Sequence, residues 1–302
     1  MFSAAVGGFI YGVPAPSAVS KKAIFGYGAA GNLGTQSVTN LVSNTGVVAT
    51  DTTGVGTARG QLAAAGYGTD KAIFGYGNGP TAITNLVSNT GVVGNNVTGV
   101  GTARSFPAAA GYGTDKAIFG YGNSGSVTAI TNLVSNIGVV ANDTAGVGTA
   151  RQYLAAASYG TDKAIFGYGN SGSVTAITNL VSNTGVVATD TTGVGTARSY
   201  LAAAGYGSDK AIFGYGRITP NTNITNLVSN TGVVATDTTG VGTSRYGLAA
   251  AGYGTDKAIF GYGTTDDGEQ NMTNLVSNTG VVATDTAGVG TARYYLAAAS
   301  YG

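Results

Sequence analysis

The sequence contains no cysteine, no histidine and no tryptophan, and only 9% of its 302 residues are charged. Without cysteine there is no disulfide framework and no thiolate nucleophile, and without histidine there is no imidazole base and no zinc or haem site of the usual kinds. A net charge of +1 lacks the positive potential typical of nucleic-acid-binding proteins. We therefore expect no cofactor, no metal and no nucleic-acid partner.

Long apolar runs are also absent, because no stretch approaches the roughly 20 residues that a membrane-spanning helix needs. Residues 1–19 contain an apolar stretch and small residues near "PSAVS", but no basic residue precedes that stretch, so they are a weak match to a signal peptide. The favoured interpretation is an N-terminal arm that packs on the body or docks on a partner. Its candidate docking residues are Phe2, Phe9, Ile10 and Tyr11.

What the sequence does contain is a repeat. The motif "KAIFGYG" begins at Lys22, Lys71, Lys116, Lys163, Lys210 and Lys257, with spacings of 49, 45, 47, 47 and 47 residues. Repeats of about 40–50 residues are typical of the four-stranded blades of β-propellers. No segment has the apolar spacing of a helix, so the chain is predicted to be all-β.

Each repeat divides into four predicted strands, separated by Gly and Asn turn signals. In the repeat from Lys163 they are "KAIFGYG", "VTAITNLVSN", "TGVVATDTTGVG" and "YLAAAGYG". Alternation along the first predicts Ala164, Phe166 and Tyr168 on one face of the strand and Ile165 on the other. The alanine run suits a crowded axis, so we predict "LAAA" innermost, then "KAIFGYG", then "ITNLVSN", with "GVVATDTTG" outermost.

Each end of the chain lacks the strand that the other end could supply. The last repeat ends with an innermost strand, "LAAASYG", and the first begins at the second strand, "SKKAIFGYG". The C-terminal strand is therefore predicted to complete the first blade, giving a six-bladed β-propeller of four-stranded antiparallel blades over residues 20–302. An open solenoid is the alternative, but it would need atypical polar caps at both ends.

The segment "GVGTARSYLAAAGYGSDKAIFGYG" resembles a kelch repeat, which has an Arg shortly before a small-residue strand and then a strand ending in glycines. The likeness covers residues 19–302. The near-identical, Gly- and Tyr-rich repeats also resemble kelch-like arrays in tail or fibre proteins of marine and cyanobacterial phages. The first resemblance implies a propeller, and the second implies a virion component.

One arginine occurs at the same place in each repeat, with an Asp eight residues upstream except in the second repeat, where Asn96 takes that place. We interpret these arginines as structural, pinning one blade to the next through carbonyls or the Asp. The set is Arg59, Arg104, Arg151, Arg198, Arg245 and Arg293.

Variation between repeats is concentrated in the connections that lead from the second to the third strand and from the outermost to the next innermost strand. In an antiparallel blade both emerge on one face, and loops on a rigid scaffold often carry function. The alternative is neutral drift in exposed loops. The candidate binding residues are Phe106, Tyr153, Tyr200, Arg217, Tyr246, Asp266, Asp267, Glu269, Tyr294 and Tyr295.

An enzyme is disfavoured. Asp266, Asp267 and Glu269 would offer paired carboxylates for glycoside hydrolysis, at about 5–10 Å, but three acids in one Gly-bearing loop are more typical of a solvated tip or a weak Ca²⁺ site. The favoured hypothesis is a non-enzymatic structural module, in a virion or extracellular, that binds other structural proteins in an assembly or a cell-surface glycan. A lectin-like, carbohydrate-binding propeller is the alternative.

Overall fold

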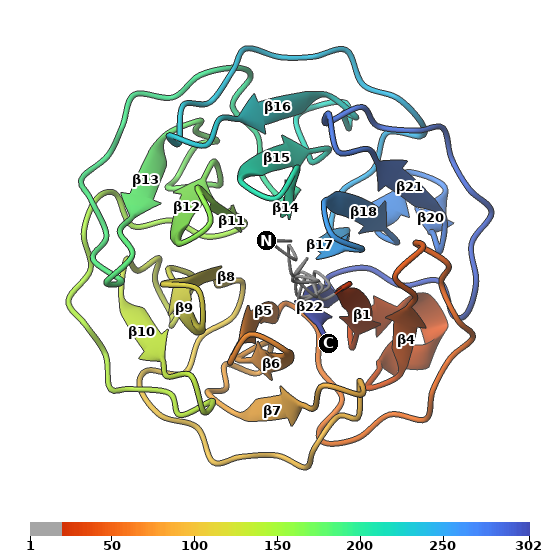
Figure 1. The fold of residues 1–302 in the computed structure, drawn as a ribbon, viewed down its shortest axis with the longest axis horizontal. Helices are drawn as coiled ribbons and strands as arrows, with labels where there is room; N and C mark the ends of the chain where they lie inside the picture. Colours follow the sequence, from red (N-terminus) through yellow and green to blue (C-terminus); the bar gives the residue numbers. More distant parts are fainter. Residues whose placement is uncertain (1–19) are drawn as a thin grey trace, which may run out of the picture.

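The structure is a computed structural model and describes residues 20–302; the proposed arm of residues 1–19, with Phe2, Phe9, Ile10 and Tyr11, lies outside the described residues. The described chain is all-β and forms six three-stranded antiparallel sheets around a common axis (Figure 1). Its only helical segment, among these residues, is the 3-10 turn η1 (Gly31–Leu33), and no helix among them is long and apolar enough to cross a membrane. The arrangement is that of a β-propeller-like repeat.

The strands of the six sheets, written from the axis outward, have the following bounds. The first sheet is β22 (Ala297–Tyr301), β1 (Lys22–Gly26) and β4 (Thr39–Val42), and the second is β5 (Ala63–Tyr67), β6 (Lys71–Gly75) and β7 (Thr84–Val87). The third is β8 (Ala108–Tyr112), β9 (Lys116–Gly120) and β10 (Thr131–Val134), and the fourth is β11 (Ala155–Tyr159), β12 (Lys163–Gly167) and β13 (Thr178–Val181). The fifth is β14 (Ala202–Tyr206), β15 (Lys210–Gly214) and β16 (Thr225–Val228), and the sixth is β17 (Ala249–Tyr253), β18 (Lys257–Gly261) and β21 (Thr273–Val276). Two short hairpins lie in loops, β2 (Ala29–Ala30) with β3 (Gly34–Thr35) and β19 (Thr264–Thr265) with β20 (Gly268–Glu269).

The alanine strands lie nearest the axis, as predicted, but the expected fourth strand is not formed. In the fourth sheet the segment after β13 meets that strand only at two isolated bridges, Val181 with Val187 and Thr178 with Thr191. Between them the side-chain amide of Asn179 donates to the carbonyl of Ala188 at 3.0 Å. A side chain therefore takes the place of a backbone ladder bond, and the outer segment stays irregular.

The last strand of the described chain shares a sheet with the first. Strand β22 pairs antiparallel with β1, with Lys22 opposite Tyr301 and Gly26 opposite Ala297. In Figure 1 the sixth and second sheets flank this sheet on its two sides. The β22–β1 register matches that of β11 with β12, where Tyr159 lies opposite Lys163.

Backbone hydrogen bonds join the turns between the first two strands of neighbouring sheets. In each turn a glycine N–H donates to a carbonyl of the next sheet; Gly160, for example, donates to Asp209 at 2.7 Å. The bond from Gly302 to Asp70 links the first sheet to the second, and the bond from Gly254 to Lys21 links the sixth to the first. The remaining three run from Gly68 to Asp115, from Gly113 to Asp162 and from Gly207 to Asp256.

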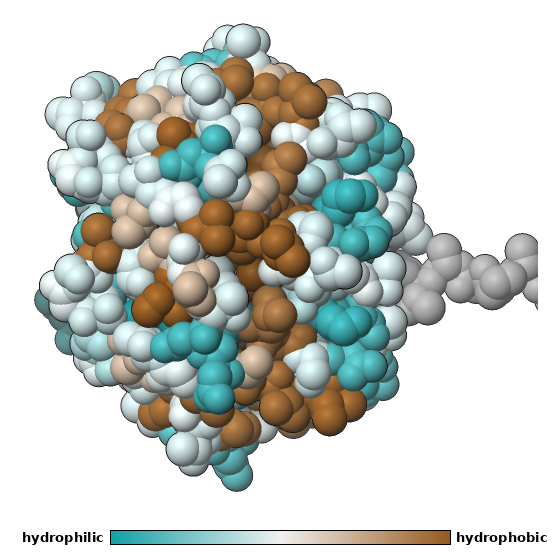
Figure 2. All heavy atoms as spheres, turned by 90° about the vertical axis from the view of Figure 1, so that its left-hand side faces the viewer, coloured by the Kyte–Doolittle hydropathy of each residue, from teal (hydrophilic) through white to brown (hydrophobic). Residues whose placement is uncertain are grey.

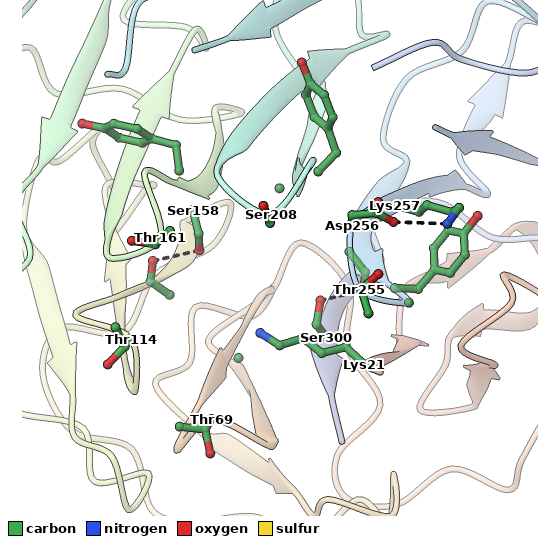
Figure 3. A pocket seen from close by; sticks show the side chains of 18 of the residues that line it. Lys21, Thr69, Thr114, Ser158, Thr161, Ser208, Thr255, Asp256, Lys257 and Ser300 are labelled. Carbon is green, nitrogen blue, oxygen red and sulfur yellow. Dashed lines mark hydrogen bonds and ion pairs between the residues drawn. The ribbon is translucent and has the colours of Figure 1, made fainter. Parts of the chain in front are cut away.

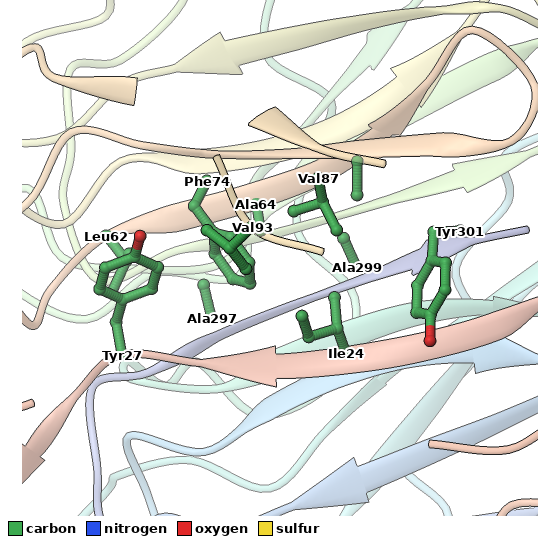
Figure 4. Close-up of a cluster of buried hydrophobic side chains, with 11 residues drawn as sticks. Ile24, Tyr27, Leu62, Ala64, Phe74, Val87, Val93, Ala297, Ala299 and Tyr301 are labelled. Carbon is green, nitrogen blue, oxygen red and sulfur yellow. The ribbon is translucent and has the colours of Figure 1, made fainter. Parts of the chain in front are cut away.

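The core of residues 20–302 consists of six apolar clusters, each between two neighbouring sheets. Between the first and second sheets, Ile24 and Ala299 face Phe74 and Val87 (Figure 4). Glycine ends the second strand of every sheet because the neighbouring sheet leaves no room for a side chain there. A Cβ on Gly26 would lie 2.7 Å from the tip of the Phe74 ring.

One predicted face assignment is wrong. Tyr168 does not share a face with Ala164 and Phe166; it lies in the cluster of Ile165, on the side of the next sheet. The reason is its backbone φ of 64°, because a left-handed residue after the strand breaks the alternation of side chains. Its ring packs edge-on against Phe213 at 5.1 Å.

The rim of the disc exposes apolar side chains, which appear as brown areas between hydrophilic edges (Figure 2). One valine of each repeat, in the turn that follows the third strand, is 60–66% exposed. These valines are Val47, Val92, Val139, Val186, Val233 and Val281.

Candidate functional site

The variable connections lie together on one face, as the sequence predicted. In five of the six sheets an isolated bridge joins the segment before the innermost strand to the connection after the second strand, for example Gln152 with Asn170 and Ser199 with Arg217. In the second sheet a backbone hydrogen bond from Asn78 to Gly60, at 2.9 Å, joins the same two segments. Tyr246 is joined to Thr264, at the base of the β19–β20 hairpin, in the same way. We call this surface the loop face.

Four of the predicted aromatic residues meet at the axis on the loop face. Phe106 and Tyr153 have ring centroids 4.4 Å apart, and Tyr153 stacks on Tyr200 at 4.0 Å. Tyr295 completes the cluster, at 5.3 Å from Phe106 and 5.4 Å from Tyr200. We call these four residues the aromatic plug, because their half-buried rings pack on one another instead of standing apart as stacking platforms.

The backbone holds the plug in place. Its four residues occupy the second position after the repeated arginine and have φ between 53° and 59°. Gln61 and Gly247 hold the same position in the second and sixth sheets, with φ of 58° and 64°. Hydrogen bonds link neighbouring positions, for example Tyr200 N–H to the Tyr153 carbonyl and Gln61 N–H to the Tyr295 carbonyl. A small cavity of about 70 Å³ lies among these residues.

The other two predicted tyrosines lie beside the plug. Tyr246 is 5.7 Å from Tyr200, and Tyr294 is 4.4 Å from Tyr295, both between ring centroids. The guanidinium of Arg217 lies 4.9 Å from the centre of the Tyr246 ring, a cation–π contact. The aromatic residues and Arg217 therefore form one continuous surface.

The three predicted acids lie in the β19–β20 hairpin and line neither axial cavity. Asp266 and Asp267 are exposed at the tip of the β19–β20 hairpin, and Asp266 accepts a hydrogen bond from Asn221 at 3.0 Å. Glu269 is half-buried near Gly31. Within residues 20–302 no group of three Asp, Glu, His or Cys side chains is placed to hold a metal ion.

The six repeated arginines are buried and join neighbouring sheets. Arg151 donates to the carbonyl of Tyr168 at 2.8 Å and to the side-chain oxygen of Asn179 at 2.7 Å, both in the fourth sheet. Its guanidinium lies 4.3 Å from the centre of the Tyr121 ring, which belongs to the third sheet. Burial lowers the pKa of Arg151, but Arg stays charged at neutral pH.

The expected role of the Asp needs correction. Asp190 accepts hydrogen bonds from Thr149 and from Asn179, so it reaches Arg151 mainly through the asparagine. The closest direct approaches of an Asp to a repeated arginine are 3.7 Å, between Asp51 and Arg293, and 3.9 Å, between Asp285 and Arg245. Sequence reasoning missed this asparagine, which is the second residue of the "TNLV" segment in every repeat. A polar residue repeated at one place within an apolar strand was the signal that could have identified it.

A larger cavity, of about 250 Å³, opens on the axis at the opposite face (Figure 3). The turns between the first two strands of all six sheets line it. Sequence reasoning identified their Asp residues as turn residues but did not predict the cavity. Five of these turns carry an Asp–Lys ion pair; in the fourth sheet Asp162 and Lys163 are 3.0 Å apart.

No protein-family model matches the chain, and no curated protein is significantly similar to it in sequence.

Proposed function

We propose that residues 20–302 form a closed, six-bladed, kelch-like β-propeller that serves as a non-enzymatic interaction module. Support for closure comes from the β22–β1 pairing, from the six glycine-to-carbonyl bonds that link successive sheets, and from the contact of Arg293 with Asn40. Each blade has three strands and an irregular outer segment.

The interaction surface of this proposal is the loop face. The observation that carries it is that the repeats are nearly identical in their strands and buried networks, whereas most of their differences in aromatic and charged residues lie in connections bridged to one another on that face. A rigid scaffold with one variable face is the usual design of a recognition module. The sector of Arg217, Tyr246 and the β19–β20 hairpin is its most distinctive part.

The resemblance to phage tail and fibre arrays extends the proposal to a virion component that binds other structural proteins or a cell surface. The experiment is quantitative mass spectrometry of purified particles from a system that encodes this chain. We expect the wild-type chain to co-purify with particles and an Arg217→Ala, Tyr246→Ala variant to be depleted. A matched double variant on the rim, Val186→Ala, Val233→Ala, should be retained. Absence of the wild-type chain from particles would contradict the virion assignment.

Carbohydrate binding is the second candidate, favoured by the partly exposed Tyr246 ring beside Arg217 and by the exposed Asp266–Asn221 pair. An aromatic face next to amide and carboxylate groups is a common way to bind a sugar ring. Binding of the wild-type chain to a glycan array, lost in Tyr246→Ala, would support this candidate. A blank array would leave protein binding as the function of the face.

A further inference from the structure

The axial cavity on the face opposite the loop face has a polar lining, and some of its hydroxyls make no hydrogen bond to the scaffold. Thr69, Thr114, Thr161, Ser208 and Thr255 place one hydroxyl-bearing residue from each of five sheets around it (Figure 3). All five residues are exposed. Among residues 20–302, the hydroxyls of Thr69, Thr114 and Thr161 make no hydrogen bond, so they are available to a ligand.

Four of these five hydroxyl-bearing residues occupy costly backbone positions. Thr69, Thr114 and Thr161 have φ between 67° and 69°, and Ser208 has φ of 64°. The left-handed region is strained for a β-branched residue, and Gly, Asn or Asp would fit such a turn at lower cost. The same turn nevertheless carries a hydroxyl in each of these sheets, which points to a use for the hydroxyl itself.

The charge around this cavity is unbalanced at one place. Five turns carry an Asp and a Lys, which pair at 2.8–3.5 Å. In the first sheet "Ser20-Lys21-Lys22" replaces "Thr-Asp-Lys", so the six turns together hold seven lysines and five aspartates. The difference is two positive charges, both contributed by the first sheet.

Lys21 is the side chain that brings this excess to the axis. Its N–H and carbonyl both bond to Gly254 at 2.8 Å, which fixes its backbone, and its side chain lines the cavity with its ammonium directed inward (Figure 3). Lys22 does not line the cavity. Within the described residues Lys21 has no ion-pair partner, and residues 1–19 contain no acidic side chain.

We propose that this cavity is a binding site for a small oxyanion, a phosphate or carboxylate group held by the Lys21 ammonium and the surrounding threonine hydroxyls. An ammonium forms charge-assisted hydrogen bonds with oxyanions, and the hydroxyls supply further donors. The cavity volume of about 250 Å³ sets an upper bound on the part of the ligand that enters. This site is independent of the loop face and of the partner bound there.

The test is isothermal titration calorimetry of the full chain with inorganic phosphate and, separately, with citrate. Chloride at matched ionic strength is the control for screening. We expect saturable binding of at least one of the two anions, with one site per chain. Binding of phosphate alone would identify a phosphate site, and binding of citrate alone would identify a carboxylate site. Absence of saturable binding of both would overturn the proposal.

Two variants with the same net charge distinguish a specific anion-binding site from general electrostatic attraction of anions to the protein. Lys21→Gln removes the ammonium that lines the cavity, whereas Lys22→Gln removes one from the same turn outside it. We expect Lys21→Gln to weaken binding at least about tenfold, as loss of a charge-assisted hydrogen bond predicts, and Lys22→Gln to change it much less. Equal weakening by both would contradict the proposal.

A third variant tests whether lost binding results from lost folding. Lys21→Asp gives the first sheet the residue that the other five sheets have, so the backbone bonds to Gly254 should persist and the fold should be kept. We expect normal thermal unfolding and no anion binding. Anion binding retained by a folded Lys21→Asp protein would show that Lys21 does not hold the anion.

Discussion

The guanidinium of Arg293 donates a hydrogen bond to the side-chain oxygen of Asn40, which lies 253 positions earlier in the chain. In the fourth sheet the same contact, between Arg151 and Asn179, spans 28 positions. A contact that is local in other repeats is therefore made here between the two ends of the described chain. The first sheet therefore shares the buried arginine–asparagine contact of the fourth.

Removing the asparagine of one network should be costly. In Asn179→Ala the guanidinium of Arg151 loses an acceptor at 2.7 Å and the carbonyl of Ala188 loses a donor at 3.0 Å. Leaving a buried charged group without its partner costs about 2–4 kcal/mol. Urea unfolding followed by circular dichroism measures this loss, and a loss close to zero would contradict the assigned role.

The Asp of the same network should tolerate a neutral replacement. In the second repeat Asn96 already accepts hydrogen bonds from Thr57 N–H and from Asn85, as Asp190 does from its own partners. We therefore expect Asp190→Asn to change the free energy of unfolding at pH 7 by no more than about 1 kcal/mol. A cost as large as that of Asn179→Ala would mean that the charge itself is required.

The lowered pKa of these aspartates predicts how the stability of the protein changes in acid. Burial opposes ionisation of Asp190, but hydrogen bonds from Thr149 and Asn179 outweigh it and hold its pKa below the usual 3.8. A group whose pKa is lowered by folding stabilises the protein above its unfolded pKa, and this contribution is lost as the pH falls through the folded value. We expect an Asp143→Asn, Asp190→Asn, Asp237→Asn protein to lose less stability than wild type between pH 7 and about pH 3. Equal losses would contradict the pKa assignment.

The glycine that ends each second strand should resist substitution. A Cβ on Gly167 would lie 2.7 Å from the tip of the Phe213 ring, so Gly167→Ala overpacks the core and should cost about 1–3 kcal/mol. Gly94→Ala is the matched control, because its nearest neighbour is the Leu86 carbonyl at 3.4 Å and the equivalent residue in the other repeats is alanine. The control should be neutral or stabilising by up to about 1 kcal/mol. Thermal unfolding of the two variants compares them.

Much of the fold could be predicted from the sequence because the six near-identical repeats can be compared with one another within one chain. The spacing of "KAIFGYG" gave the period, the alanine run gave the innermost strand, and the unmatched ends gave the expected pairing of residues 293–302 with residues 20–28. The shared face of the variable connections followed from antiparallel order alone, and the bridge between Ser199 and Arg217 agrees with it.

The features that were missed depend on side-chain geometry that periodicity does not encode. The flipped face of Tyr168 follows from its left-handed backbone, and the irregular outer segment follows from the amide of Asn179, which bonds from β13 to that segment. Likewise, Tyr153 and Tyr200 were predicted on the loop face, but their stacking into a plug depends on convergence at the axis. The sequence separated variable from constant positions without indicating which side chains touch.

Closure of the ring is tested most directly by distances between spin labels on the rim. Because the chain has no cysteine, Val92, Val186 and Val281, each 66% exposed, accept unique labels after substitution by Cys. In a closed six-bladed ring Val281 and Val186 are both two blades from Val92, whereas along an open array Val281 is four repeats away. Double electron–electron resonance should give the same distance for the Val92–Val281 and Val92–Val186 pairs. A markedly longer Val92–Val281 distance would contradict the closed propeller.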